Sequence, residues 1–291
     1  MALETYANVV VAGVLTGLVY GLSALGLSVI FGVIRIVNFA HGEMMVMGMF
    51  LALELFRWFG LDPLWSMPIA AAALFAFGYA LQALLVHRVA HLPEHLQFLL
   101  LAGVATVMVS AGQMVFGPDA RGAQVGYALD SYAIGPIVVD KVRLFAGAAA
   151  LGVAALLFGF FRYTLLGKAI RACADNHQGA LVVGLNVARL YALTFGIGAA
   201  CIGAAGAIIL LLVDVHPYLA PGYTLLAFVI VIVGGLGSMP GALLGGVLIG
   251  ASEALAGFLL VPSLKSAFSF GVLILVLLLR PQGLLGRVAA P

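Results

Sequence analysis

Charged residues are scarce in this sequence. Asp, Glu, Lys and Arg together make up only 8% of its 291 residues. Soluble domains carry roughly 25% charged residues, because water has to solvate their surface. Hydrophobic residues make up 64% of the chain, and the mean hydropathy is +1.21. A surface with so little charge must mostly face lipid, which excludes an ordinary soluble protein.

Several long windows contain no Asp, Glu, Lys or Arg at all. They are residues 5–34, 63–87, 95–118, 144–161, 190–213 and 215–252. A helix needs about 20 apolar residues to cross a bilayer core of roughly 30 Å, and several windows reach that length. The ten-residue alternation typical of membrane β-strands is absent. The sequence therefore predicts an all-α, polytopic integral membrane protein.

We expect about eight to nine transmembrane helices in a single transmembrane domain that covers residues 1–291. The nine candidate spans are 8–31, 38–56, 65–86, 97–116, 143–161, 190–213, 223–236, 241–260 and 266–280. The seventh and eighth are glycine-rich, and Pro240 interrupts them. Two shallow, re-entrant helices would fit that region as well as two full crossings.

Motifs that carry chemistry are also rare. The two cysteines, Cys173 and Cys201, suggest free thiols. The segment "LLGKAI" lacks the upstream glycine and the hydroxyl of a phosphate-binding loop. His87, His91 and His95 have helical spacing, but a proline interrupts them. We therefore expect no catalytic residue, no metal and no bound cofactor, and the net charge of +2 is too small to suggest nucleic acid.

The basic residues predict the orientation of the chain. With the N-terminus outside, eight basic residues fall on the inner side: Arg35, Arg88, Arg162, Lys168, Arg171, Arg189, Arg280 and Arg287. Five fall on the outer side: Arg57, Arg121, Lys141, Arg143 and Lys265. Since inner loops of membrane proteins carry an excess of Lys and Arg, residues 162–189 are expected in the cytoplasm. The turn-rich segment 117–143 is then a periplasmic loop.

Three polar or glycine-rich elements interrupt the apolar pattern. The first is the insert 162–189, which we interpret as a helix, a turn at 175–177 and a second short helix. Its composition alone favours an ordinary basic loop that sets topology, over a lever for a partner protein. If the protein moves a solute uphill, it needs either an ion gradient or ATP hydrolysis by a partner.

The second element, residues 31–50, holds Arg35, Asn38, His41 and Glu43 between two apolar runs. Polar groups at membrane depth are costly unless they are paired or line a wet cavity, so they are candidates for a transport path. A structural role is equally open, with Asn38 and His41 capping helix ends and Glu43 paired to Arg35.

The third element, residues 234–255, contains seven glycines and Glu253. Glycines permit close helix contact, and broken apolar segments often line transport paths. Tight packing without substrate contact is the simpler interpretation.

Together these elements resemble the inner-membrane permeases of branched-chain amino acid ABC importers, specifically the shorter of the two paired permease types. The family's first motif stands here as "VNFAHGE", Val37–Glu43. The family's insert motif matches Arg171, Ala172, Ala174, Asp175, Ala180, Gly184, Leu185 and Asn186. The glycine motif matches Gly234, Gly235, Gly237, Ser238, Pro240, Gly241, Ala242, Gly245, Gly246, Gly250 and Glu253. His177, Gln178 and Leu185 depart mildly from the family pattern.

The resemblance implies a permease subunit in a bacterial inner membrane. Its partners would be a second, longer permease, two cytoplasmic ATPases that bind the ATP, and a periplasmic binding protein. The eight insert residues just named would couple to the ATPase, which reverses the interpretation from composition. Asn38, His41, Glu43, Gly234, Gly235, Gly237, Ser238 and Glu253 remain candidates for the translocation path. The first choice of substrate is a branched-chain or other hydrophobic amino acid. The alternatives are an ABC permease for urea, amides, or aromatic or other organic acids, and an ATPase-independent secondary transporter.

Overall fold

The computed structural model describes residues 2–90, 92–135, 137–260 and 264–286, so that His91 and Arg287 lie outside the described residues. Its twelve α-helices confirm the predicted all-α class. They are α1 (Ala2–Ile34), α2 (His41–Phe59), α3 (Pro63–Leu81), α4 (His87–Val89), α5 (Glu94–Phe116), α6 (Lys141–Tyr163), α7 (Leu165–Asp175), α8 (His177–Val182), α9 (Val187–Ile209), α10 (Ala220–Gly234), α11 (Met239–Leu259) and α12 (Lys265–Leu279). A π-helical turn, η1 (Gln82–Val86), joins α3 to α4, and a 3₁₀ turn, η2 (Pro217–Leu219), precedes α10.

Seven helices in the described part of the chain are long and apolar enough to cross a membrane. The other two expected spans correspond to α2 and α12. Helix α2 carries Glu43, Glu54 and Arg57, and α12 has only 15 residues. The uncertain seventh and eighth spans are two separate helices, α10 and α11, joined by a tight turn.

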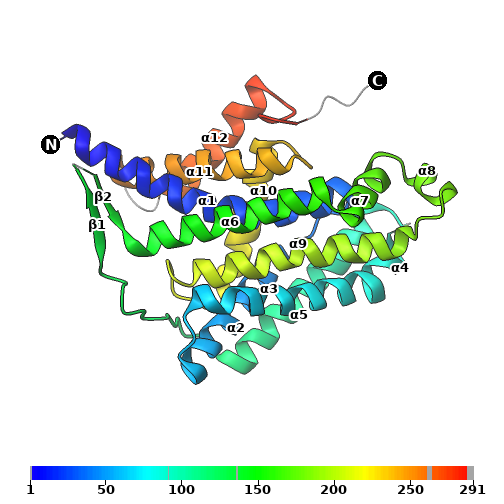
Figure 1. The fold of residues 1–291 in the computed structure, drawn as a ribbon, viewed down its shortest axis with the longest axis horizontal. Coiled ribbons are helices and arrows are strands. Elements are labelled where there is room, and N and C mark those ends of the chain that lie inside the picture. Colours follow the sequence, from blue (N-terminus) through cyan, green and yellow to red (C-terminus); the bar gives the residue numbers. More distant parts are fainter. Residues whose placement is uncertain (1, 91, 136, 261–263, 287–291) are drawn as a thin grey trace.

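The two ends of the molecule carry different structures (Figure 1). An antiparallel hairpin of β1 (Ser131–Ile134) and β2 (Ile137–Asp140) lies at the end where α1 begins. Helix α8 lies at the opposite end of the long axis. We call these the hairpin end and the insert end. Helices α1, α6 and α9 run between them, as expected for helices that cross a bilayer.

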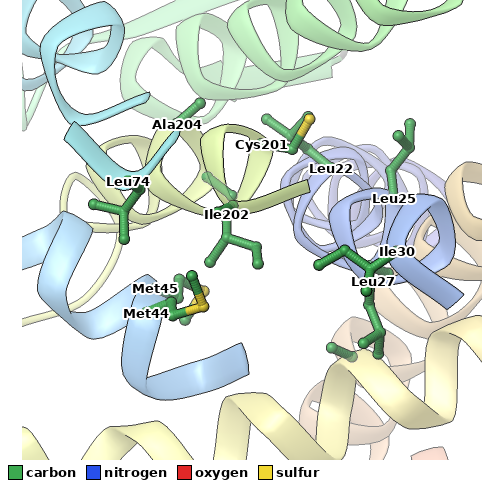
Figure 2. Packing of buried hydrophobic residues seen from close by; sticks show 14 of the residues in the cluster. Leu22, Leu25, Leu27, Ile30, Met44, Met45, Leu74, Cys201, Ile202 and Ala204 are labelled. Carbon is green, nitrogen blue, oxygen red and sulfur yellow. The ribbon is translucent and has the colours of Figure 1, made fainter. Parts of the chain in front are cut away.

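Helix α9 is the centre of the bundle. Of its apolar window, 83% is buried, against 17% for α5, so α5 lies at the edge of the bundle. Figure 2 shows Ile202 of α9 between Leu74 of α3 and Leu22 of α1, with Met44 and Met45 of α2 close by. The core is therefore built by α1, α2 and α3 packed around α9.

Glycines bring α1 and α11 into backbone contact. Gly13, Gly17 and Gly21 recur every fourth residue and share one face of α1. A Cβ added at Gly17 would lie 2.6 Å from the carbonyl oxygen of Gly246, and one at Gly250 would lie 2.6 Å from that of Gly13. Small residues at this spacing allow membrane helices to approach closely, because no side chain separates the two backbones.

Hydrogen bonds fasten the loop between α5 and α6 to the rest of the hairpin end. Arg121 and Val215 exchange backbone hydrogen bonds of 3.0 and 2.7 Å. The Tyr127 hydroxyl donates to Oδ2 of Asp62 at 2.8 Å, while Oδ1 of Asp62 caps α3 by accepting from the Leu64 amide. Burial, and then the adjacent Asp62 carboxylate, raise the pKa of Tyr127.

Tyr127→Phe is expected to loosen this loop. The pKa of Tyr127 is raised, so the protonated phenol makes its full contribution to stability at any pH below the ordinary tyrosine pKa of about 10. This contribution is lost as the pH rises through the higher pKa of the folded state. Hydrogen exchange of residues 119–130 should therefore accelerate about 5-fold or more at neutral pH, as fits a lost hydrogen bond of about 1–1.5 kcal/mol.

The matched control is Tyr132→Phe, a tyrosine on the neighbouring hairpin whose ring lies 5.1 Å from Nζ of Lys141. Phenylalanine preserves that ring contact, so exchange should stay unchanged. Equal exchange rates in wild type and Tyr127→Phe would show that the phenol does not hold the loop.

Candidate functional site

The chain turns back into the bundle after α1. Helix α1 ends at Ile34, yet Nε2 of His41 lies 3.2 Å from Oγ of Ser23, which is eleven positions before that end. Eleven helical residues span roughly 17 Å, and the six residues 35–40 can cover that distance when extended. Helix α2 therefore begins beside the middle of α1, inside the protein.

Buried polar groups gather at the start of α2. Asn38, His41 and Glu43 are all buried. Oδ1 of Asn38 accepts from the Ala40 amide at 3.1 Å, so Asn38 makes a local turn just before the helix. Nδ1 of His41 is buried and has no hydrogen-bond partner among the residues that the structure describes.

The Thr224 hydroxyl of α10 joins this cluster from a distant part of the chain. It accepts from the Gly42 amide at 2.8 Å and lies 3.4 Å from Oε2 of Glu43, to which it donates. Glu43 is in the first turn of α2, where the helix dipole favours a negative charge. Arg35, by contrast, is exposed, with a left-handed φ of 58°, and Glu43 is bonded to Thr224 instead of the expected arginine.

Thr224→Val is expected to destabilise the protein by about 1–3 kcal/mol, because the isosteric valine leaves the buried Gly42 amide without an acceptor. The thermal midpoint of the purified chain in detergent should fall by about 3 °C or more. Thr194→Val is the matched control, since this buried hydroxyl only donates back to the Leu190 carbonyl of its own helix at 2.8 Å. Equal midpoints for the two variants would contradict the assigned role of Thr224.

The glycine motif builds the turn between α10 and α11. Gly235 and Gly237 have φ of 106° and 76°, which side chains rarely adopt. Oγ of Ser238 accepts from the Gly241 amide at 3.2 Å and caps α11. Gly234 packs against the backbone of Gly241. These residues have a structural role in the turn.

The last described segment of the chain completes this turn. The amides of Leu284 and Leu285 donate to the carbonyls of Val233 and Gly234 at 2.8 and 2.9 Å. A Cβ at Gly235 would collide with the backbone of Gly286. The end of α10 is therefore held by residues about 50 positions further along the chain.

Glu253 does not meet Glu43. It accepts from the Ser269 hydroxyl at 2.7 Å and borders a cavity of about 590 Å³ at the hairpin end. On α10, Tyr223 lines this cavity, while the next residue, Thr224, faces Glu43. On α1, Tyr20 lines the cavity, while Ser23 faces His41. The two candidate acids thus lie on different sides of α1 and α10.

The cavity is lined by both polar and apolar side chains. It is bordered by α1, β2, α6, α9, α10, α11 and the first residue of α12. Charged residues on its wall are Asp140, Arg143, Glu253 and Lys265. Tyr20 and Tyr223 lie edge to face, with ring centroids 6.5 Å apart. A site of this size and mixed lining can hold a small organic solute.

The insert folds as a helix, a turn and a second helix, as expected from its sequence. Helix α7 ends at Asp175, and Oδ1 of Asn176 caps α8 by accepting from the Gly179 amide at 2.8 Å. Gly184, with φ of 82°, lies in the turn that follows α8. Oδ1 of Asn186 caps α9 by accepting from the Arg189 amide at 3.0 Å. The geometry of the insert is therefore fixed by local hydrogen bonds.

Apolar side chains are exposed at the last turn of α8 and directly after it. Leu181, Val182 and Val183 are 53%, 87% and 74% exposed, while Ala180 is buried and anchors the helix. Among the candidate coupling residues, Arg171, Ala172 and Asp175 are also exposed. Ala174 and Leu185 are half-buried.

Helix α7 holds α8 against the bundle. Cys173 is buried on the inner side of α7, and this burial raises the pKa of its thiol. Nδ1 of His177 lies 3.0 Å from the Tyr191 hydroxyl of α9. Backbone contact at Gly167 seats the start of α7 on the end of α6.

Several residues of this arrangement were missed by the sequence analysis. Tyr223 and Thr224 stand at the start of the apolar run 223–236 and carry no local motif. The repeat of Gly13, Gly17 and Gly21 was a signal that could have identified the face of α1 that meets α11.

Comparisons with known proteins bear on the whole chain. The sequence profile of a protein family described as "Branched-chain amino acid transport system / permease component" matches residues 9–277. The high-affinity branched-chain amino acid transport system permease protein LivH of Escherichia coli is 33% identical, over 94% of this chain and 94% of its own length. The corresponding protein BraD of Pseudomonas aeruginosa is 32% identical, over 97% and 96% of the two chains. A probable LivH of Methanocaldococcus jannaschii is 26% identical over 91% and 88%.

Proposed function

Because this chain belongs to the branched-chain amino acid transport permease family, we propose that it is the membrane-spanning subunit of an ATP-driven, binding-protein-dependent importer of branched-chain or other hydrophobic amino acids. It is a multi-pass protein of the inner membrane. The observation that carries the proposal is the similarity to LivH and BraD over nearly the whole of each chain, since it includes both the spans and the insert.

We assign the ATPase-binding role to α7 and α8, with ATP bound only by the partner subunits. The exposed apolar side chains of α8 support this assignment, because the insert end is predicted to face the cytoplasm and lipid would not cover them there. Segment 117–143 at the hairpin end would receive the periplasmic binding protein.

The contacts of the insert suggest how movement of an ATPase would reach the bundle. Helix α7 packs against α1, α6 and α9, and α9 in turn contacts α1, α2 and α3. A displacement of α8 would therefore be passed to the central helix. ATP binding then drives transport only by favouring one of two arrangements of the permease, and no covalent chemistry is needed in this chain.

The test is purification of the chain from its native membrane with mass spectrometry of what accompanies it, and uptake of radiolabelled amino acids by cells with and without the chain. We expect two ATPases, a longer permease, and leucine uptake that disappears with the chain. A chain that purifies alone at low salt and takes up solute with an ion gradient would make it a secondary transporter. Urea, amide or organic-acid uptake in place of leucine would overturn the substrate.

A further inference from the structure

We propose that the cavity at the hairpin end is a binding site for a free zwitterionic amino acid within this single chain, with Glu253 contacting the ammonium group and Lys265 the carboxylate. The proposal rests on the proposed function and adds the place and chemistry of recognition. The walls of the cavity come from the first part of α1, strand β2, and the ends of α6, α9, α10, α11 and α12 that lie nearest the hairpin.

Glu253 offers a carboxylate that is only partly used. The Ser269 hydroxyl donates to Oε1 at 2.7 Å. In the described part of the chain, no hydrogen bond or ion pair within 4 Å reaches Oε2. A charged group held at a fixed place inside a membrane protein needs a partner, and an ammonium ion from solute would provide one.

Lys265 offers the opposite charge across the same space. It is the first residue of α12, and its side chain lies over Gly257 of α11, where an added Cβ would collide with Cε. Gly257 is one helical turn beyond Glu253, so the Lys265 side chain covers the same face of α11 that carries Glu253. Their charged groups nevertheless form no ion pair within 4 Å among the described residues. A zwitterion placed between them would contact both.

The other two charges of the cavity already neutralise each other. Nη1 of Arg143 lies 3.0 Å from Oδ2 of Asp140. The four charged side chains on the wall therefore sum to zero, with one closed pair and one open pair. This balance favours a zwitterion over an amine or a carboxylic acid alone, since either of the latter would leave one charge of the open pair unmatched.

Apolar side chains line the remainder of the wall. Ile209 is the last residue of α9, Leu212 and Val213 follow that helix, and Val9 and Ala12 come from the first half of α1. They would bury a branched aliphatic side chain, at about 25 cal/mol per Å² of apolar area removed from water. A cavity of about 590 Å³ leaves room for a leucine with several waters, in the usual size range of small-molecule sites.

The experiment is L-leucine binding to the full chain in lipid nanodiscs, measured by isothermal calorimetry. Isovalerate, which lacks the ammonium group, and isoamylamine, which lacks the carboxylate, are the comparison ligands. Each is expected to bind at least about 10-fold more weakly than leucine, as fits the loss of one charge-assisted hydrogen bond.

Glu253→Gln and Lys265→Met are the test variants. Glutamine keeps the acceptor for Ser269, so that Glu253→Gln removes the charge with little change in packing. Each variant should raise the leucine Kd about 10-fold or more. The matched control is Glu54→Gln, a carboxylate of α2 paired to Arg57 outside the cavity, which should leave the Kd unchanged. Size-exclusion profiles of the variants verify that they fold.

The outcomes separate the site from the proposed function. Leucine that binds wild type and Glu253→Gln equally well, or that does not bind wild type at 10 mM, would overturn the cavity as a site. If cells carrying the complete transporter still take up leucine, the proposed function survives that failure. Binding of isovalerate or isoamylamine as tight as that of leucine would also overturn recognition of the zwitterion.

Discussion

Gly250→Ala is expected to destabilise the protein by about 3 kcal/mol or more, at the upper end of the range for overpacked cores. The added methyl group would meet the backbone of α1 at two positions, because Gly13 and Gly17 lie directly opposite. Side chains can change rotamer to relieve a clash, but two backbones can only separate. The measurement is the thermal midpoint of the purified chain, with a fall of about 6 °C or more, together with the yield extracted as a monodisperse species.

The matched control is Gly152→Ala in α6, where an added Cβ meets nothing within 4 Å. Alanine favours a helix over glycine by about 0.5–1 kcal/mol, so this variant should be neutral or slightly more stable. A glycine-to-alanine substitution is thus expected to lower the stability at position 250 and to preserve or slightly raise it at position 152. A normal midpoint for Gly250→Ala would mean that α1 and α11 are not in backbone contact.

A double variant that combines Leu181→Asp and Val182→Asp is expected to reduce ATP-driven uptake at least about 100-fold, while the chain remains folded. Both side chains are largely exposed, so their loss should change the thermal midpoint by no more than about 2 °C. Two negative charges in a buried apolar interface would have no partner, and an unpaired buried charge costs several kcal/mol. The ATPase should no longer co-purify with the chain.

Leu129→Asp provides the control at the opposite end of the chain. Leu129 is fully exposed, in the loop of the hairpin end. This variant should retain the ATPase. If the α8 variant also retained the ATPase and normal uptake, the insert would be a loop without a coupling role.

Local chemistry made the insert predictable. The turn at residues 175–177 is polar, and the structure ends α7 at Asp175 and begins α8 at His177. Side chains such as Asn176 cap helices through neighbours three residues away, so that a short sequence contains the whole arrangement. The apolar spans were equally accessible, because bilayer thickness sets a minimum helix length.

Long-range contacts were not predictable in the same way. The expected span 38–56 begins three residues before α2, because Asn38 bonds to the Ala40 amide and delays the helix. The Thr224 hydroxyl meets Gly42 across 182 positions, and nothing near either residue marks the pair. The contacts among the candidate path residues could therefore be identified only from the structure. It separated Glu253 from Glu43, although both follow a break in an apolar run.

The attachment of residues 284 and 285 to the end of α10 has a consequence for how the protein is made. A ribosome synthesises α10 and α11 well before α12. The carbonyls of Val233 and Gly234 therefore have no hydrogen-bond donor until residues 284 and 285 are made. Unpaired backbone groups in a bilayer cost several kcal/mol each. A nascent chain that stops before residue 284 would carry that defect permanently. Closure of this turn therefore has to follow the synthesis of residues 284 and 285, although α10 itself is made about 50 residues earlier.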